Sequence, residues 1–142
     1  MTTPSALHRP TDISRSHRLA ARVAVAAAFL LARLPPRRIR AVCALLSRGA
    51  APATYAEAKA ARDAVLAVSL TCLGTHGCLP RSLATTLLCR MAGVWPTWCV
   101  GARMMPPFGA HAWVEADGRL VDEQGPEGYF SPLMSVPPRR GR

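Results

Sequence analysis

The pattern of apolar and polar positions changes near Gly93. Before this residue, apolar side chains mostly recur every three or four positions, which is typical of helices packed on a core. After it, short apolar runs alternate with polar residues and are interrupted by glycine and proline, as in strands. The chain is therefore predicted to be α+β, with helices first and a small antiparallel sheet second.

The first predicted helix follows a run of alanine, leucine and valine with arginines at its flanks. Its apolar positions recur near i, i+4, i+7 and i+8 and are expected to face the core: Leu19, Val23, Ala26, Ala27, Leu30, Leu31 and Leu34. Only ten residues separate Arg22 from Arg33, and a membrane span needs about 20. We therefore expect a core helix, with a peripheral membrane contact as the alternative.

Two more helices are predicted from their boundary residues. Pro36 suits the first turn of a helix whose apolar residues keep a helical period until Gly49 ends it. The stretch TYAE, residues 54–57, is a capping box for a third helix that runs to about Ser69. The first half of the domain, about residues 17–70, is therefore expected to be helical.

A further helix is predicted to begin around Cys78 and to end at Gly93. Gly77 allows a close approach before it, and Pro80 suits its first turn. Unpaired backbone N–H groups at a helix N-terminus stabilise a thiolate, and the same groups can stabilise an oxyanion. Cys78 is therefore the candidate nucleophile, whereas Cys89, well inside the helix, is expected to pack in the core.

The five cysteines do not form an obvious disulfide framework or metal site. Their number is odd and no export signal is evident, so we expect reduced thiols and a cytoplasmic location. His76 and Cys78 stand close together, but the chain contains no paired CxxC motif. No metal ion and no cofactor are predicted, and zinc binding is kept only as a minor alternative.

A β-hairpin is predicted around the sequence AHAWVEADGRLVDE, with His111 on its first strand. Asp117 and Gly118 supply the turn. A two-residue turn would place Asp122 on the face of His111, one step along the partner strand. A three-residue turn, with Gly118 as a bulge residue, would place Glu123 directly opposite His111. In either register, one acid is expected to reach the imidazole.

These residues together match the catalytic set of a cysteine acyl-transfer enzyme. A cysteine at a helix start, a histidine on a strand and a carboxylate on the partner strand supply nucleophile, base and orienting acid. Cys78 would attack a carbonyl carbon, and His111 would take or share the thiol proton. Water would then hydrolyse the thioester that forms.

Positive charge is concentrated in the first part of the chain. The net charge is +10, and through Ala56 the chain has nine arginines and one acid, which gives 9 − 1 = +8. Such a basic surface suits an acidic peptide or protein, an anionic membrane or nucleic acid. Nucleic acid is not predicted, because Lys59 is the only lysine and no aromatic residues interleave with the arginines.

Two stretches, CLPRSLATTLLCRMAG and TWCVGARMMPPFGAHAWVEADGRLVDE, resemble the leader peptidases of lasso peptide biosynthesis. These are bacterial proteins with a transglutaminase-like, papain-related core, and the resemblance extends from about Leu19 onward. Its specific parts are a cysteine followed by an Arg-Ser pair, here Cys78, Arg81 and Ser82, and the AHAWVE segment with its Gly-Arg turn exit.

The resemblance implies a role for each candidate catalytic residue. Cys78 would be the nucleophile, His111 the base, and an acid at the position of Glu123 the third member. The family often has a small or polar residue before that acid, whereas this chain has Asp122. Both acids therefore stay candidates; we favour Glu123, with which the three-residue turn agrees.

The resemblance also implies a substrate and partners. Such enzymes cut the leader from a ribosomally synthesised lasso precursor peptide, and an ATP-dependent cyclase then closes the freed core peptide. Some members carry a small leader-recognition domain, for which a chain of 142 residues leaves no room. We therefore expect a separate leader-recognition protein as partner, and we expect Arg81 and the surface arginines Arg37, Arg38 and Arg40 to bind substrate or partner.

The expected organisation is one peptidase domain between two tails. The domain covers residues 17–130, and flexible tails are predicted for residues 1–16 and 131–142. Two alternatives from other classes stay open. A transglutaminase-like acyltransferase would use the same triad with an amine in place of water, and a noncatalytic basic module would bind a partner or a membrane surface through the arginine-rich helices.

Overall fold

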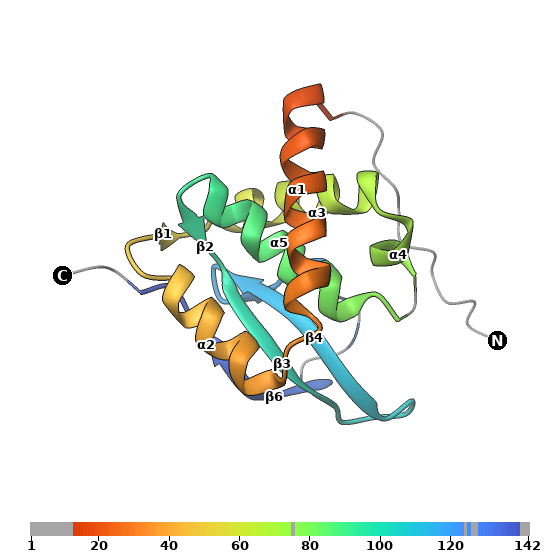
Figure 1. Cartoon of the computed structure of the whole chain (residues 1–142). Helices are drawn as coiled ribbons and strands as arrows, with labels where there is room; N and C mark the ends of the chain where they lie inside the picture. The colour runs from red at the N-terminus through yellow and green to blue at the C-terminus, as the bar shows by residue number, and fades with distance from the viewer. Residues whose placement is uncertain (1–12, 75, 124, 126–127, 140–142) are drawn as a thin grey trace.

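The computed structural model of the chain describes residues 13–74, 76–123, 125 and 128–139. The helices are α1 (Arg15–Leu31), α2 (Pro36–Leu46), α3 (Tyr55–Val68), α4 (Leu70–Leu73) and α5 (Cys78–Met91). The strands are β1 (Ala51–Pro52), β2 (Val94–Trp95), β3 (Thr97–Arg103), β4 (Gly109–Ala116), β5 (Arg119–Leu120) and β6 (Phe130–Val136). Helices come first and the main sheet second, which confirms the predicted α+β class (Figure 1).

Helix α5 is the centre of the helical layer. It packs against α1, α3 and strand β4, so its first residue is fixed between the other helices and the sheet (Figure 1). The core around it is built from small and apolar side chains, including the buried residues Leu83, Trp95 and Trp98. The Trp98 indole N–H donates to the Ser82 hydroxyl at 3.1 Å, which ties β3 to α5.

Several helix boundaries follow the local signals in the sequence. Thr54 and Glu57 form the predicted capping box, with both reciprocal hydrogen bonds at 3.1 Å. Pro36 stands at the first position of α2, and Gly49 follows this helix with a φ of +76°. Positive φ is readily adopted by glycine, so Gly49 lets the chain turn away from α2 as predicted.

The predicted core face of α1 is wrong at most of its positions, with Leu31 as the exception. Its buried positions are Ala21, Ala24, Ala28 and Leu31. Most of the larger side chains that were expected inside are exposed, among them Leu19, Val23 and Leu30, the last at 65%. The reason is steric, since the alanine stripe lets α1 approach α3 and α5 closely. Among the described residues, every helix is too short or too polar to cross a lipid bilayer.

The main sheet is antiparallel, with strand order β5-β4-β3-β6. A second, two-stranded parallel sheet joins β1 to β2. Strand β6 corrects the predicted C-terminal tail, because Ser131 to Val136 pair with β3. Pro132 is accommodated because β6 is an edge strand and its register shifts beside this residue. Residues 140–142 lie outside the described residues.

The predicted N-terminal tail also needs correction at its end. Helix α1 begins at Arg15, and the Ser14 side chain caps it by accepting a hydrogen bond from the His17 backbone N–H at 3.3 Å. A serine in this place satisfies one of the free N–H groups of the first turn. Residues 1–12 of the predicted tail lie outside the described residues.

The hairpin between β4 and β5 has a two-residue turn. Glu115 pairs with Leu120 and Ala116 with Arg119, while Asp117 and Gly118 both have positive φ, at 53° and 70°. This is the geometry of a type I′ turn, whose twist suits a tight hairpin. The three-residue turn, which would have placed Glu123 directly opposite His111, is therefore wrong.

Candidate active site

Cys78 is the first residue of α5, as the sequence predicts. Gly77 makes this position possible, since a Cβ on it would lie 2.2 Å from the Thr71 carbonyl oxygen and 2.9 Å from Cys72 Cα. The short helix α4 therefore packs directly against the start of α5. Cys78 itself is half-buried, with its side chain near the middle of strand β4.

His111 lies in that part of β4, opposite Gly101 of β3. Its side chain is only 5% exposed, and the ring stacks on Phe130 with centroids 4.7 Å apart. Gly101 allows this arrangement, because a Cβ on it would lie 1.9 Å from the Ser131 carbonyl oxygen of β6. The close approach of β6 thus brings Phe130 against the imidazole.

The carboxylate of Glu123 contacts the imidazole of His111. Its Oε2 is 3.0 Å from Nε2, and the two side chains are 11% and 5% exposed. A carboxylate accepts hydrogen bonds, so Nε2 carries a proton and donates it to this contact. In the neutral ring Nδ1 is then the free base, the atom that the candidate nucleophile needs.

Arg103 approaches the other ring nitrogen. Its Nη2 lies 3.3 Å from Nδ1 of His111, and a guanidinium only donates hydrogen bonds. This contact therefore fits a neutral ring, in which Nδ1 accepts. An imidazolium carries a proton on both nitrogens, so Arg103 must withdraw from Nδ1 whenever His111 is charged.

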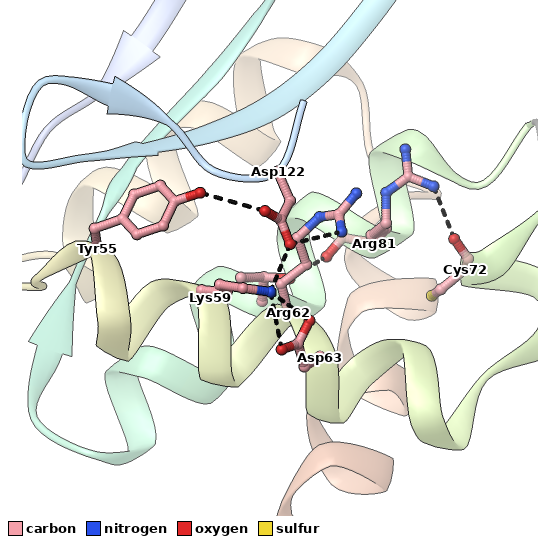
Figure 2. Close-up of polar contacts among 8 residues, drawn as sticks. Tyr55, Lys59, Arg62, Asp63, Cys72, Arg81 and Asp122 are labelled. Atoms are coloured by element: carbon pink, nitrogen blue, oxygen red, sulfur yellow. Dashed lines mark hydrogen bonds and ion pairs between the residues drawn. The ribbon is translucent and has the colours of Figure 1, made fainter. Parts of the chain in front are cut away.

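Asp122 points away from His111. It has a φ of +49°, a left-handed conformation that interrupts the strand-like alternation expected from the two-residue turn. Its carboxylate accepts hydrogen bonds from Lys59 Nζ at 2.8 Å and from the Tyr55 hydroxyl at 3.3 Å (Figure 2). Arg62 Nη1 lies 3.8 Å away. The backbone at Asp122 thus directs one acid to helix α3 and the next acid, Glu123, to His111.

The environment of Cys78 favours its thiolate. Burial raises the pKa of this thiol, but a hydrogen bond with His111, the Ala112 backbone N–H and the charges of His111 and Arg81 together bring it below its ordinary value of 9.0. Burial lowers the pKa of the His111 imidazole, yet the hydrogen bonds with Cys78 and Glu123 raise it above 6.5 overall. The lowered pKa of Cys78 and the raised pKa of His111 both favour a thiolate and imidazolium pair.

The surroundings of the remaining cysteines raise their thiol pKa values above the ordinary value. Burial raises the pKa of Cys43 and Cys89 to about 12. Burial, together with the nearby carboxylate of Glu115, does the same for Cys99, and burial also raises the pKa of Cys72. Thiols of this kind are unreactive packing groups. Cys78 is therefore distinguished chemically from the other cysteines of the chain.

Arg81, which is predicted to bind substrate or partner, lies in the interior. It is 7% exposed, and its Nη1 donates to the Cys72 carbonyl oxygen at 2.9 Å (Figure 2). With Arg62 and Glu123 it lines a small internal cavity of about 10 Å³. Its guanidinium places a positive charge behind both Cys78 and Glu123. The structure therefore assigns it to the support of the site.

Two of the predicted binding arginines on α2 line hollows that Cys78, His111 and Glu123 do not share. Arg37 and Arg40 line a groove beside β6, whereas Arg38 is exposed and lines none of the cavities described.

Two residues of this site were missed in the sequence. Arg103 is separated from His111 by a loop with no recognisable motif, and Phe130 lies at the edge of the supposed C-terminal tail. The aromatic pair Tyr129 and Phe130 was the available signal for a buried segment at that place. Within the described residues, no group of three His, Cys, Asp or Glu side chains is placed to hold a metal ion.

Comparison with known protein families identifies the superfamily of this chain. A family model described as the transglutaminase-like superfamily matches residues 21–135, and the chain therefore belongs to this superfamily. Comparisons with curated proteins and with solved structures give no significant match. The matched range runs from the buried stripe of α1 to the last part of β6, so it includes Cys78, His111 and Glu123.

Proposed function

We propose that the chain is a cysteine peptidase that removes the leader from a ribosomally synthesised lasso precursor peptide. One observation carries the catalytic part: His111 is bound on Nε2 by Glu123 and shares a hydrogen bond with Cys78, the cysteine whose thiol pKa is lowered. Membership of the transglutaminase-like superfamily supports cysteine-dependent acyl chemistry. The lasso precursor as substrate rests on the motif resemblance around Cys78 and His111.

The first half of the reaction forms a thioester. The Cys78 thiolate attacks the carbonyl carbon of the scissile peptide bond, and the electron pair of the C=O bond moves onto oxygen. When this tetrahedral intermediate collapses, the C–N bond breaks and the His111 imidazolium protonates the leaving amine. The leader segment then stays on Cys78 as a thioester, and the core peptide leaves with a free amine.

The second half returns the free enzyme. The neutral imidazole of His111 removes a proton from a water molecule, whose oxygen attacks the thioester carbon. The C–S bond breaks, the leader leaves with a new carboxylate, and the thiolate and imidazolium pair is restored. Glu123 holds the ring in one orientation during both steps, since its carboxylate stabilises the imidazolium and fixes the proton on Nε2.

The developing oxyanion needs hydrogen-bond donors. The first backbone N–H groups of a helix lack intrahelical partners, and Cys78 lies at this end of α5. They are therefore suited to stabilise negative charge beside the nucleophile, together with the positive end of the helix dipole.

In this proposal the chain performs only the cut. A separate leader-recognition protein presents the precursor, and an ATP-dependent lasso cyclase closes the core peptide, with all three acting in the bacterial cytoplasm. The freed amine is the group that the cyclase joins to an acidic side chain. The proposal thus places hydrolysis before cyclisation.

Mass spectrometry of a cognate precursor mixed with the enzyme and the recognition protein tests the function. We expect a leader with a free carboxylate and a core peptide with a free amine. Cys78→Ala and His111→Ala should abolish both products, and Glu123→Ala should reduce them far more than Asp122→Ala. Added primary amines distinguish the two chemistries: leader amides in place of the free acid would identify an acyltransferase. Cleavage by Cys78→Ala would refute both.

A further inference from the structure

A basic groove runs between helix α2 and strand β6. One part of it is a hollow of about 200 Å³ that is lined by Arg37, Arg40 and Arg139, among others. A more open hollow of about 450 Å³ continues along Pro132 to Ser135 and shares Arg40 and Ser135 with the first. We call these two connected hollows the α2–β6 groove.

Strand β6 is the last strand of its sheet. It pairs with β3 on one side, and within the described part of the chain no strand pairs with its other side. An edge strand presents unpaired N–H and C=O groups, and an extended peptide can add to it as a further strand. Helix α2 lies beside β6 (Figure 1), and residues of both elements line the two hollows.

The charge of the groove selects an acidic ligand. Arg37, Arg40 and Arg139 are exposed, and among the described residues no aspartate or glutamate lines either hollow. Guanidinium groups bind carboxylates with strong, often bidentate hydrogen bonds. Ser135, Pro137 and the 80% exposed Leu133 supply the polar and apolar contacts between these charges.

The groove is continuous with the candidate active site through β6 itself. The strand begins at Phe130, which stacks on His111, and it ends at Val136, which lines the basic hollow. Its seven residues span about 20 Å at roughly 3.3 Å per step. His111 lies on β4, two strands in from β6, so a peptide added to this edge would lie about 14 Å from β4. It would reach Cys78 only through residues that continue past the Phe130 end of the strand.

We infer that the α2–β6 groove binds an acidic, extended segment of the peptide substrate, which adds to β6 as a strand. The acidic residues of that segment would lie several positions from the bond that is cut, because the arginines line the hollows along Pro132 to Val136 and the catalytic residues do not. This inference rests on the proposed peptidase function and specifies where its substrate is recognised outside the catalytic residues.

Binding can be measured without catalysis on the Cys78→Ala protein. The probe is a fluorescein-labelled peptide of about twelve residues with glutamate at alternate positions, titrated by fluorescence anisotropy. Its matched partner has glutamine in place of every glutamate. We expect the acidic probe to bind at least about tenfold more tightly at low salt. Methylating the backbone nitrogens on one edge of the acidic probe should also weaken binding, because those N–H groups form the added ladder.

Charge reversal locates the binding surface. Arg40→Glu changes the residue shared by both hollows and should remove most of the preference for the acidic probe. Arg22→Glu on α1 makes the same charge change at an exposed position outside the groove and should retain that preference. Equal affinity for the two probes, or equal losses in both variants, would overturn the inference. So would an Arg40-dependent preference for anionic vesicles or RNA over the peptide.

A cleavage experiment separates this inference from the proposed function. Wild-type protein is given precursor variants in which a pair of glutamates is moved along the peptide, and the products are mapped by mass spectrometry. Cleavage should be most efficient at one spacing between the pair and the cut, and Arg40→Glu should remove that optimum. Cleavage that ignores the pair refutes the groove and leaves the peptidase standing. Probe binding at Arg40 without any cleavage of the precursor refutes the peptidase alone.

Discussion

The hydrogen bond between Glu123 and His111 permits a quantitative test of the site. Glu123→Gln keeps the shape of the side chain and an oxygen able to accept from Nε2, but it removes the charge. The contact is 3.0 Å long, between side chains that are 11% and 5% exposed, so solvent screens it little. A hydrogen bond to a charged group contributes about 1.5 to 3 kcal/mol. We therefore expect kcat/KM to fall by about 10-fold to 150-fold.

The pH profile should change in a definite direction. Burial acts to lower the pKa of His111, but the hydrogen bonds with Cys78 and Glu123 raise it above the ordinary value of 6.5. The imidazolium is required with the thiolate, so activity is lost as pH rises through this raised pKa. Without the charge of Glu123 the imidazolium is less stable, and the alkaline limb of kcat/KM should move to lower pH.

Asp122→Asn is the matched control for this experiment. It makes the same chemical change at the next residue, and asparagine adopts the left-handed φ of 49° readily. The Asp122 side chain is 33% exposed and contacts Lys59, not His111, so we expect a change in kcat/KM of less than about threefold. Steady-state kinetics on a quenched fluorescent precursor peptide measures both variants. Equal losses in the two, or an unchanged alkaline limb in Glu123→Gln, would refute the assigned roles.

Three further predictions use other properties of the site. Iodoacetamide at mildly acidic pH should modify Cys78 before the other cysteines, as measured by peptide mapping, and His111→Ala should slow that reaction. Early labelling of another cysteine would contradict the directions of the pKa shifts. Gly77→Ala should destabilise the fold by about 1–3 kcal/mol in denaturant unfolding and reduce labelling of Cys78. Gly74→Ala is the control: its Cβ would lie 3.3 Å from the nearest oxygen, so the loss of stability should be smaller. Burial acts to raise the pKa of Asp122, but the hydrogen bond from Lys59 brings it below its ordinary value of 3.8. The stability that this carboxylate contributes is therefore lost as pH falls through the lowered pKa. In thermal melts, the melting temperature of Asp122→Asn should fall less on acidification than that of the wild type.

Local signals were sufficient for most of the helical part. The capping box at Thr54, the proline at the start of α2 and the glycine before Cys78 each act within a few residues, so the sequence contains the whole cause. Cys78 could be singled out for the same reason, because a helix N-terminus is a local feature. His111 could be found because the adjacent Asp-Gly turn marks the hairpin.

Local signals in the sequence did not determine which faces of the helices and strands pack against each other. Helix α1 has two apolar stripes, and a periodicity argument prefers the one with larger side chains, Leu19, Val23 and Leu30. The fold buries the alanine stripe instead, since small residues allow closer contact between helices. Strand β6 was missed because its prolines are typical of a tail, although an edge strand tolerates proline. Its pairing with β3 depends on contacts about thirty residues apart in the sequence.

The choice between the two acids shows how the acid that contacts His111 was favoured on a wrong turn geometry. Glu123 was favoured together with a three-residue turn, yet the hairpin has two turn residues, a register that should present Asp122. The strand ends at Leu120, however, and the left-handed conformation of Asp122 redirects the chain before it passes His111. Lys59, Tyr55 and Arg62 then contact the Asp122 carboxylate on the side of α3. The positive φ of Asp122, and not the charge of its side chain, therefore directs Glu123 to His111, and Asp122→Asn preserves this direction because asparagine adopts a left-handed φ readily.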